Sequence, residues 1–74
     1  MDAKQKAEKL ELWQGKLKKL QDELEAIMVR RGEAIAMGDL SENAAFSMAE
    51  EDAITWRVRI EEVEKIIKTI ESTK

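Results

Sequence analysis

The sequence predicts an all-α fold, an antiparallel two-helix coiled-coil hairpin that uses residues 1–74 as one domain. Two apolar stripes lie on either side of Leu40, and their gaps alternate between three and four residues, which is the spacing of a coiled-coil seam. Each residue of the first stripe has a counterpart at equal distance from residue 40, as a chain that folds back there requires. The first stripe comprises Leu10, Trp13, Leu17, Leu20, Leu24, Ile27, Arg31 and Ala34, and the second comprises Phe46, Ala49, Ala53, Trp56, Ile60, Val63, Ile67 and Ile70.

The composition is typical of long solvated helices: 39% of the residues are charged and proline is absent. The chain has neither cysteine nor histidine, which excludes disulfides, thiolate nucleophiles, zinc–thiolate sites and the usual general base near neutral pH. No apolar run is long enough to cross a membrane, and the first residues lack the apolar core of a signal peptide. We therefore expect a cytoplasmic protein without a membrane partner.

The first helix is expected from about residue 3 to residue 37, because this segment is rich in Lys, Glu, Leu, Gln and Ala. Gly15 falls on the solvent-facing side of this helix and Gly32 near its end, each at a cost of about 1 kcal/mol relative to Ala. Gly38 is the expected stop, since a residue just past a helix end often adopts the left-handed conformation that glycine tolerates.

Residues 38–43 form the expected tip of the hairpin, and the second helix is expected from about residue 42 to residue 71. The sequence offers two caps for this helix. Asp39, with Glu42 three residues later, is a D-x-x-E version of the capping box, and Ser41 is the other candidate.

The antiparallel register places charges of opposite sign on the flanks of the seam. It brings Glu23 near Arg59 and Arg30 near Asp52, pairs that select the register more than they stabilise it. Arg31 is a charged residue within the seam itself, and we expect its stem to lie along the second helix while its head reaches solvent.

Some apolar residues lie outside the seam. Ile54 and Val58 are one helical turn apart on the outer face of the second helix, and Met28, Val29 and Ile35 project from the first helix near the tip. Either these are ordinary scattered surface residues or a self-association surface, or they contact another domain or partner.

The tip half of the chain is acidic. Between Gly32 and Trp56 the sequence contains no Lys or Arg. Solvated helix faces account for most charge runs of this kind. An acidic end disfavours a nucleic-acid backbone as the direct partner of the tip and favours a cation, or a basic or metal-bearing pocket.

Asp39 and Glu42 are closely spaced carboxylates on a turn, and two interpretations of them are open. In one, Asp39 caps the second helix and Glu42 interacts with the positive end of its dipole. In the other, both are presented at the end of a stiff arm, where they cannot hold Mg²⁺ alone but can complete a site supplied by a partner. The sequence has no nucleophile–base pair and no glycine-rich phosphate loop, so an independent enzyme is not expected.

The segment Gly38-Asp39-Leu40-Ser41-Glu42-Asn43-Ala44 resembles the GDLxENA tip motif of the bacterial Gre transcript cleavage factors, GreA and GreB. Arg59-Ile60-Glu61-Glu62-Val63-Glu64 is similar to the RI-x-x-(L/V)-E segment of the same family. The resemblance covers essentially the whole chain but only the N-terminal coiled-coil domain of the family, whose second, globular domain docks on RNA polymerase. After the tip motif the family often has Glu and Tyr, where this chain has Ala45 and Phe46.

This resemblance implies a transcription elongation factor domain whose tip enters the secondary channel of a backtracked RNA polymerase. Asp39 and Glu42 would help to retain a Mg²⁺ ion shared with the polymerase and would position the water that cuts the RNA 3′ end. Asn43 would support them by shaping the tip or positioning water.

The chain would then be an accessory factor rather than an enzyme, without a cofactor of its own and with only indirect contact to RNA. A monomer is expected. The alternatives are a regulator that occupies the channel and inhibits, and a purely structural coiled coil that self-associates.

Overall fold

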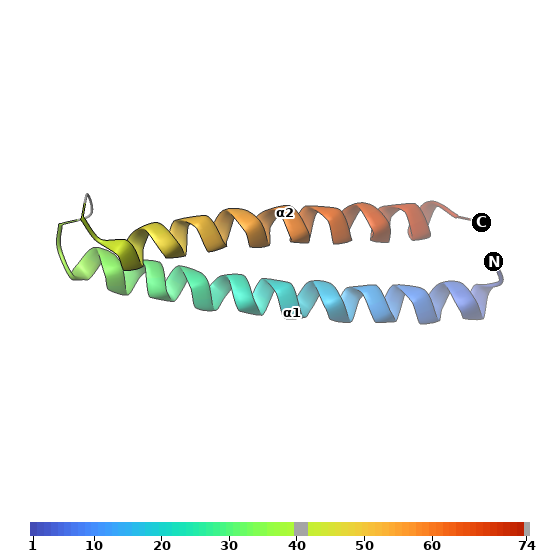
Figure 1. The fold of residues 1–74 in the computed structure, drawn as a ribbon. Helices are drawn as coiled ribbons and strands as arrows, with labels where there is room; N and C mark the ends of the chain where they lie inside the picture. The colour runs from blue at the N-terminus through green and yellow to red at the C-terminus, as the bar shows by residue number, and fades with distance from the viewer. Residues whose placement is uncertain (40–41, 74) are drawn as a thin grey trace.

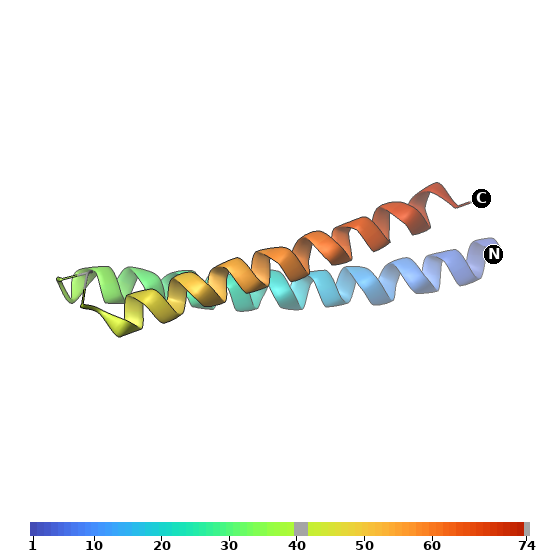
Figure 2. The same cartoon turned by 45° about the horizontal axis from the view of Figure 1, so that its top comes forward.

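The computed structural model describes residues 1–39 and 42–73, which form two long α-helices packed side by side (Figure 1). Helix α1 spans Ala3–Ala36 and helix α2 spans Ala44–Ser72. Both termini lie at one end of the molecule and the turn lies at the other, so the helices are antiparallel (Figures 1 and 2). The molecule is a rod with extents of 55 × 14 × 11 Å. The predicted all-α helical hairpin is therefore confirmed.

The base of the rod, where the termini lie, is closed by polar contacts. Asp2 caps α1 through a capping box, in which its carboxylate accepts from the Gln5 N–H at 2.8 Å and the Gln5 side chain accepts from the Asp2 N–H at 3.3 Å. Lys6 Nζ donates to the carbonyl of Glu71 at 2.9 Å and so links the first turn of α1 to the last turn of α2. Within the described residues, neither helix carries an apolar stretch of membrane-spanning length.

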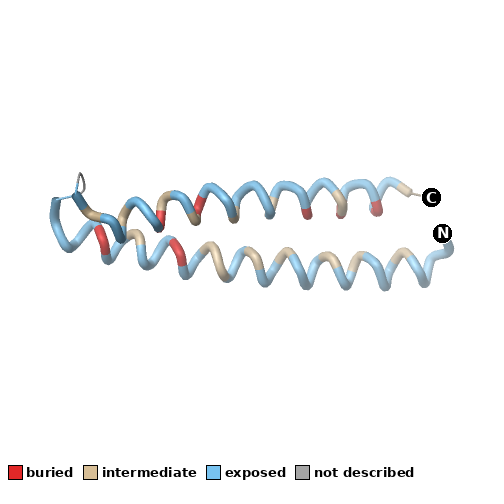
Figure 3. The backbone as a smooth tube through the Cα atoms, in the orientation of Figure 1, coloured by how far each residue is buried: buried red, intermediate tan, exposed pale blue. Residues whose placement is uncertain are grey.

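The seam follows the two stripes. Every stripe residue is buried or half-buried. The buried positions of α1 lie toward the turn, whereas those of α2 continue toward the base, where they face half-buried positions of α1 (Figure 3). Near the middle, Ile27 packs with Ala49 and Ala53, and Leu24 and Trp56 border this cluster, as the fold-back at residue 40 predicts. The buried residues are Ile27, Ala34, Ala49, Ala53, Val63, Ile67 and Ile70.

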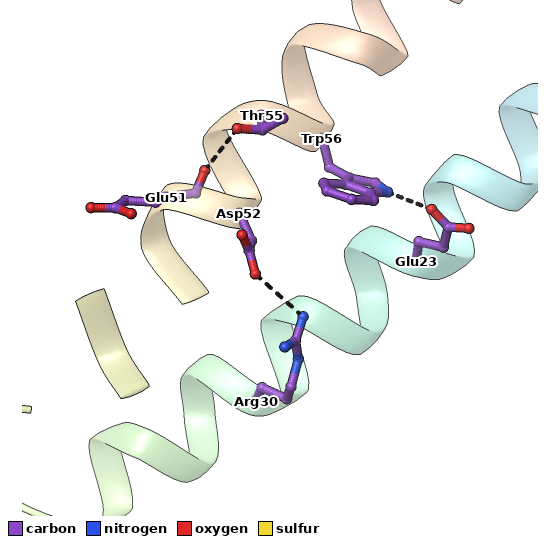
Figure 4. A network of polar contacts seen from close by, with 6 residues as sticks. All are labelled: Glu23, Arg30, Glu51, Asp52, Thr55 and Trp56. Carbon is purple, nitrogen blue, oxygen red and sulfur yellow. Dashed lines mark hydrogen bonds and ion pairs between the residues drawn. The ribbon is translucent and has the colours of Figure 1, made fainter. Parts of the chain in front are cut away.

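The flanks of the seam agree with the predicted register at one pair and differ in detail at the other. Arg30 Nη2 lies 3.7 Å from Asp52 Oδ2, as expected (Figure 4). Glu23 instead accepts a hydrogen bond of 2.6 Å from Trp56 Nε1. The Arg59 guanidinium lies 4.6 Å from the centre of the Trp56 ring. The indole therefore lies between two residues that were expected to pair, because it offers both a donor for the acid and a π-face for the cation.

Gly38 ends α1 as predicted. Its φ of 109° lies in the left-handed region that favours glycine. Its N–H donates to the carbonyl of Ile35 at 3.2 Å, and the N–H of Met37, the C-cap, donates to the carbonyl of Ala34 at 3.1 Å. The chain therefore turns away from α1 immediately before the tip acids.

The helical glycine at position 15 provides a first testable prediction. A Cβ added at Gly15 would meet no atom within 4 Å. Gly15→Ala should therefore raise the free energy of unfolding by about 1 kcal/mol. In a domain of this size the melting temperature should rise by roughly 4–8 °C, measured by far-UV circular dichroism.

Gly38→Ala is the matched control, because space is also open there but the backbone is left-handed. It should lower the melting temperature. Equal effects of the two substitutions would contradict the difference in backbone conformation on which this prediction depends.

Candidate functional site at the tip

The turn that joins the helices lies at the end of the rod opposite the termini (Figure 1), and its sequence carries two carboxylates. Asp39 follows Gly38 directly and Glu42 precedes the cap of α2, and both residues are exposed. Leu40 and Ser41, which lie between them in the motif, are outside the described residues. Asp39 and Glu42 are thus both in the turn that joins the helices, as the sequence predicted.

The N-cap of α2 is Asn43, so the expectation that Asp39 and Glu42 form a capping box for this helix is wrong. Asn43 Oδ1 accepts from the Phe46 N–H at 3.1 Å. Asn is as good an N-cap as Asp. With Asn43 as the cap, α2 begins at Ala44, and the seam residue Phe46 is its third residue. The alternative cap, Ser41, lies outside the described residues.

Asn43 also caps the other helix. Its Nδ2 donates to the carbonyl of Ala34 at 2.7 Å, in the last turn of α1. Ala34 is 1% exposed, so this carbonyl lies in the interior of the tip. Helix ends leave N–H groups unpaired at the start and carbonyls unpaired at the end. The Asn43 amide pairs the Phe46 N–H at the start of α2 and gives the Ala34 carbonyl, which also accepts from the Met37 N–H, a second donor. Asn43 therefore ties the two helices together next to Glu42.

Asn43→Asp should separate these two hydrogen bonds. Aspartate keeps the acceptor for the Phe46 N–H but has no donor for the Ala34 carbonyl and brings a negative charge towards it. We expect the free energy of unfolding to fall by about 0.5–1.5 kcal/mol, the net contribution of one hydrogen bond, because the Ala34 carbonyl keeps its bond from the Met37 N–H. The measurement is urea unfolding followed by circular dichroism.

Asn43→Ala, which loses both bonds, should be destabilised as well, with an N-cap cost alone of about 0.5–2 kcal/mol. An Asn43→Asp variant as stable as the native chain would show that the bond to Ala34 contributes nothing.

Arg31 forms a second link between the helices close to the tip. Its Nε is paired with Glu50 Oε1, and its guanidinium lies 5.2 Å from the centre of the Phe46 ring. The head of Arg31 was expected to reach solvent; the side chain is 33% exposed, and its head also contacts an acid and an aromatic ring of α2. Sequence spacing located Arg31 in the seam but could not identify these partners, since they depend on side-chain conformation.

Two exposed methionines near the tip were not identified by the sequence pattern. Met37 is 75% exposed and Met48 is 63% exposed, and both line a shallow surface hollow together with Ala34 and Ala45. Neither falls on a stripe, so the periodicity of the sequence gave no signal for them. They add an apolar border beside the acidic tip.

The charges of the tip half differ in sign between the shaft, which has both signs, and the turn. Arg30 and Arg31, the last basic residues of α1, are engaged by Asp52 and Glu50 along the shaft. The chain has no basic residue between Gly32 and Trp56, so the charged residues of the turn are all acidic. The tip is therefore suited to a partner surface of positive charge or to a metal ion.

A complete metal site is not present in the part of the chain that the structure describes, where no group of three or more His, Cys, Asp or Glu side chains could hold an ion. Carboxylate oxygens are nevertheless the ligands that Mg²⁺ prefers, and Mg²⁺ often binds through one or two carboxylates together with waters and phosphates. Asp39 and Glu42 thus fit part of a Mg²⁺ shell whose other ligands come from elsewhere.

Comparisons with known proteins identify the family of this hairpin. A family model described as "Transcription elongation factor, N-terminal" matches residues 4–71. Transcription elongation factor GreA of Lachnoclostridium phytofermentans is 40% identical to this chain over 63 residues, an alignment that covers 74% of the chain and 39% of that relative. The chain therefore spans much less than the full length of the relative. No solved structure matches it. Because the family model covers nearly all of the hairpin, the chain belongs to the GreA/GreB family of transcription elongation factors and corresponds to its N-terminal domain.

Proposed function

We propose that this hairpin inserts its acidic tip into the secondary channel of RNA polymerase and stimulates the polymerase's own Mg²⁺-dependent cleavage of backtracked RNA. The observation that supports this most directly is the position of Asp39 and Glu42, two exposed acids at the end of a stiff rod. Membership of the transcription elongation factor family supports RNA polymerase as the partner.

The shape of the molecule suits insertion. The rod is 55 Å long but only 14 × 11 Å across, so it can deliver the tip deep into a narrow passage. The two helices bury or half-bury each other's apolar stripes along the length of the rod. The tip can therefore act at a distance from whatever surface holds the base.

At the polymerase active site, Asp39 and Glu42 would supply carboxylate ligands that complete the shell of a Mg²⁺ ion. When bound there, Mg²⁺ would stabilise charge on the scissile phosphate and lower the pKa of a bound water. Asn43 would hold Glu42 in place, because it is adjacent in sequence and is fixed to both helices. Within this mechanism the chain provides ligands and positioning, while RNA polymerase performs the hydrolysis.

This role makes the chain an accessory factor rather than an enzyme. Its RNA contact would be limited to the 3′ end that the polymerase extrudes, and its place of action would be the cytoplasm, where bacterial polymerase works. The acidic tip and the paired arginines of the shaft favour contact with the polymerase and its metal over direct binding to the RNA backbone.

The test is transcript cleavage in stalled, backtracked polymerase complexes, with the chain added over a range of concentrations and scanned against Mg²⁺. We expect the transcript to shorten from its 3′ end, and the Mg²⁺ requirement to fall as the chain concentration rises. A parallel competition against a full-length Gre factor reports whether the chain occupies the channel.

Two other outcomes are informative. A chain that competes with the full-length factor but stimulates no cleavage at any Mg²⁺ concentration would be a channel-occupying inhibitor. A chain that neither competes nor stimulates would contradict a role at the polymerase channel.

A further inference from the structure

Arg31 occupies a position that a coiled coil normally gives to an apolar residue. It falls in the seam between Ile27 and Ala34, both of which are buried, and its own side chain is 33% exposed. A charged residue at such a position lowers stability relative to leucine and is retained where it selects one geometry. The contacts of Arg31 indicate which geometry that is.

Both contacts of Arg31 are with the first two turns of α2. Helix α2 begins at Ala44, the Phe46 ring lies under the guanidinium, and Glu50 follows one turn later. A guanidinium is planar, so an ion pair at its edge and a ring at its face together fix its orientation. Arg31 of α1 thus restricts both the position and the rotation of the start of α2.

Apolar packing at this end of the rod is weak. The buried residues nearest the tip are Ala34 and Ala49, whereas the base half buries Val63, Ile67 and Ile70. Burial of a methyl group contributes far less than burial of a larger side chain, because the contribution scales with apolar area. The orientation of the tip therefore depends on polar links more than that of the base does.

We propose that Arg31 is a positioning residue for the tip acids, and this proposal rests on the proposed function above. Arg31 holds Phe46 and Glu50, the Phe46 N–H is bonded to Asn43, and Asn43 is adjacent to Glu42. The start of α2, next to Glu42, is thereby held in one orientation. Arginine at position 31 makes the seam less stable than leucine would, but it fixes the orientation of the start of α2.

Arg31→Leu separates positioning from packing. Leucine suits the seam, so the midpoint of unfolding should stay the same or rise. Amide hydrogen exchange of Phe46 and Ser47, at the start of α2, should become about tenfold faster as local opening becomes easier. The maximal rate of stimulated cleavage should fall roughly ten- to a hundredfold, since small misplacements of catalytic ligands cost this much. The chain concentration for half-maximal stimulation should not change, because the shaft is intact.

Two further variants control this experiment. The exchanged pair Arg31→Glu with Glu50→Arg should restore slow exchange at Phe46 and recover part of the cleavage rate. Arg30→Leu removes the neighbouring arginine, which is 59% exposed and paired on the flank, and it should leave exchange at Phe46 unchanged.

The outcomes distinguish this proposal from the proposed function. Unchanged exchange at Phe46 in Arg31→Leu would overturn the positioning role, as would a lower midpoint of unfolding. If the native chain stimulates no cleavage, the proposed function fails, while the exchange data still decide whether Arg31 fixes the start of α2.

Discussion

Asp39→Asn and Glu42→Gln are each expected to abolish stimulated RNA cleavage while the hairpin remains folded. Both substitutions keep the shape of the side chain and remove the charge that a Mg²⁺ ligand needs. Metal stabilisation of a transition state is worth several kcal/mol, so the cleavage rate should fall roughly a hundredfold or more. The measurement is the initial rate of transcript shortening in backtracked complexes, with the melting temperature of each variant as the test of folding.

Because the N-cap of α2 is now known, the prediction for Asp39→Asn separates a capping role from a role as a metal ligand. Had Asp39 been the cap of α2, Asp39→Asn would have been silent in every assay, because asparagine caps equally well. Since Asn43 is the cap, neither acid substitution removes the N-cap of α2. Loss of activity with an unchanged melting temperature would therefore point to the chemistry of the tip.

Glu51→Gln is the matched control for these variants. Glu51 is an exposed acid on the shaft of α2, in the same acidic half of the chain but outside the turn. It should retain full activity. An equal loss of activity in Glu51→Gln would indicate that the negative charge of this half as a whole matters, rather than two specific ligands. Full activity in both tip variants would contradict the proposed mechanism.

The seam could be predicted from the sequence because its signal is repeated many times. Each stripe position is supported by neighbours three and four residues away, and the fold-back at one residue fixes all pairs together. The same register correctly predicted Arg30 beside Asp52. A pattern shared by a whole helix is robust to the conformation of any one side chain.

The details of the tip could not be predicted in the same way, because they depend on single side chains. The local pattern of Asp39 and Glu42 suggested a capping box, but Asn43, three residues before a seam residue, was also a good cap and is the one used. Its bond to the Ala34 carbonyl joins residues nine positions apart and exists only when the helices meet. The pairing of Arg31 with Glu50 likewise depends on the position of a neighbouring ring.

The position of the two tip acids in the turn was predictable, whereas their role as a site stays a prediction. Spacing on a turn and the tip motif both indicated Asp39 and Glu42, and both lie in the turn that joins the helices. Their use as Mg²⁺ ligands stays a prediction, because two carboxylates are only part of a shell and the remaining ligands would belong to the polymerase.

Ile27→Ala is expected to cause the largest loss of stability among single substitutions in the hairpin. Ile27 is 3% exposed and packs against Ala49 and Ala53, whose short side chains cannot move in to fill the space. Large-to-small changes of this kind cost about 2–5 kcal/mol. A domain of this length has a total stability of roughly 4–11 kcal/mol, so much of it would be lost. Urea unfolding followed by circular dichroism measures the change.

Ile54→Ala provides the same chemical change at a position that is 61% exposed. In a monomeric hairpin it should alter the free energy of unfolding by about 0.5 kcal/mol or less, as surface substitutions do. The pair of variants also tests the structural alternative, in which copies of the chain associate through Ile54 and Val58. In that case the midpoint of unfolding would rise with protein concentration. Ile54→Ala would then lower the midpoint and make it less dependent on protein concentration. We expect instead a midpoint that does not depend on concentration, with Ile27→Ala strongly destabilised and Ile54→Ala close to the native chain.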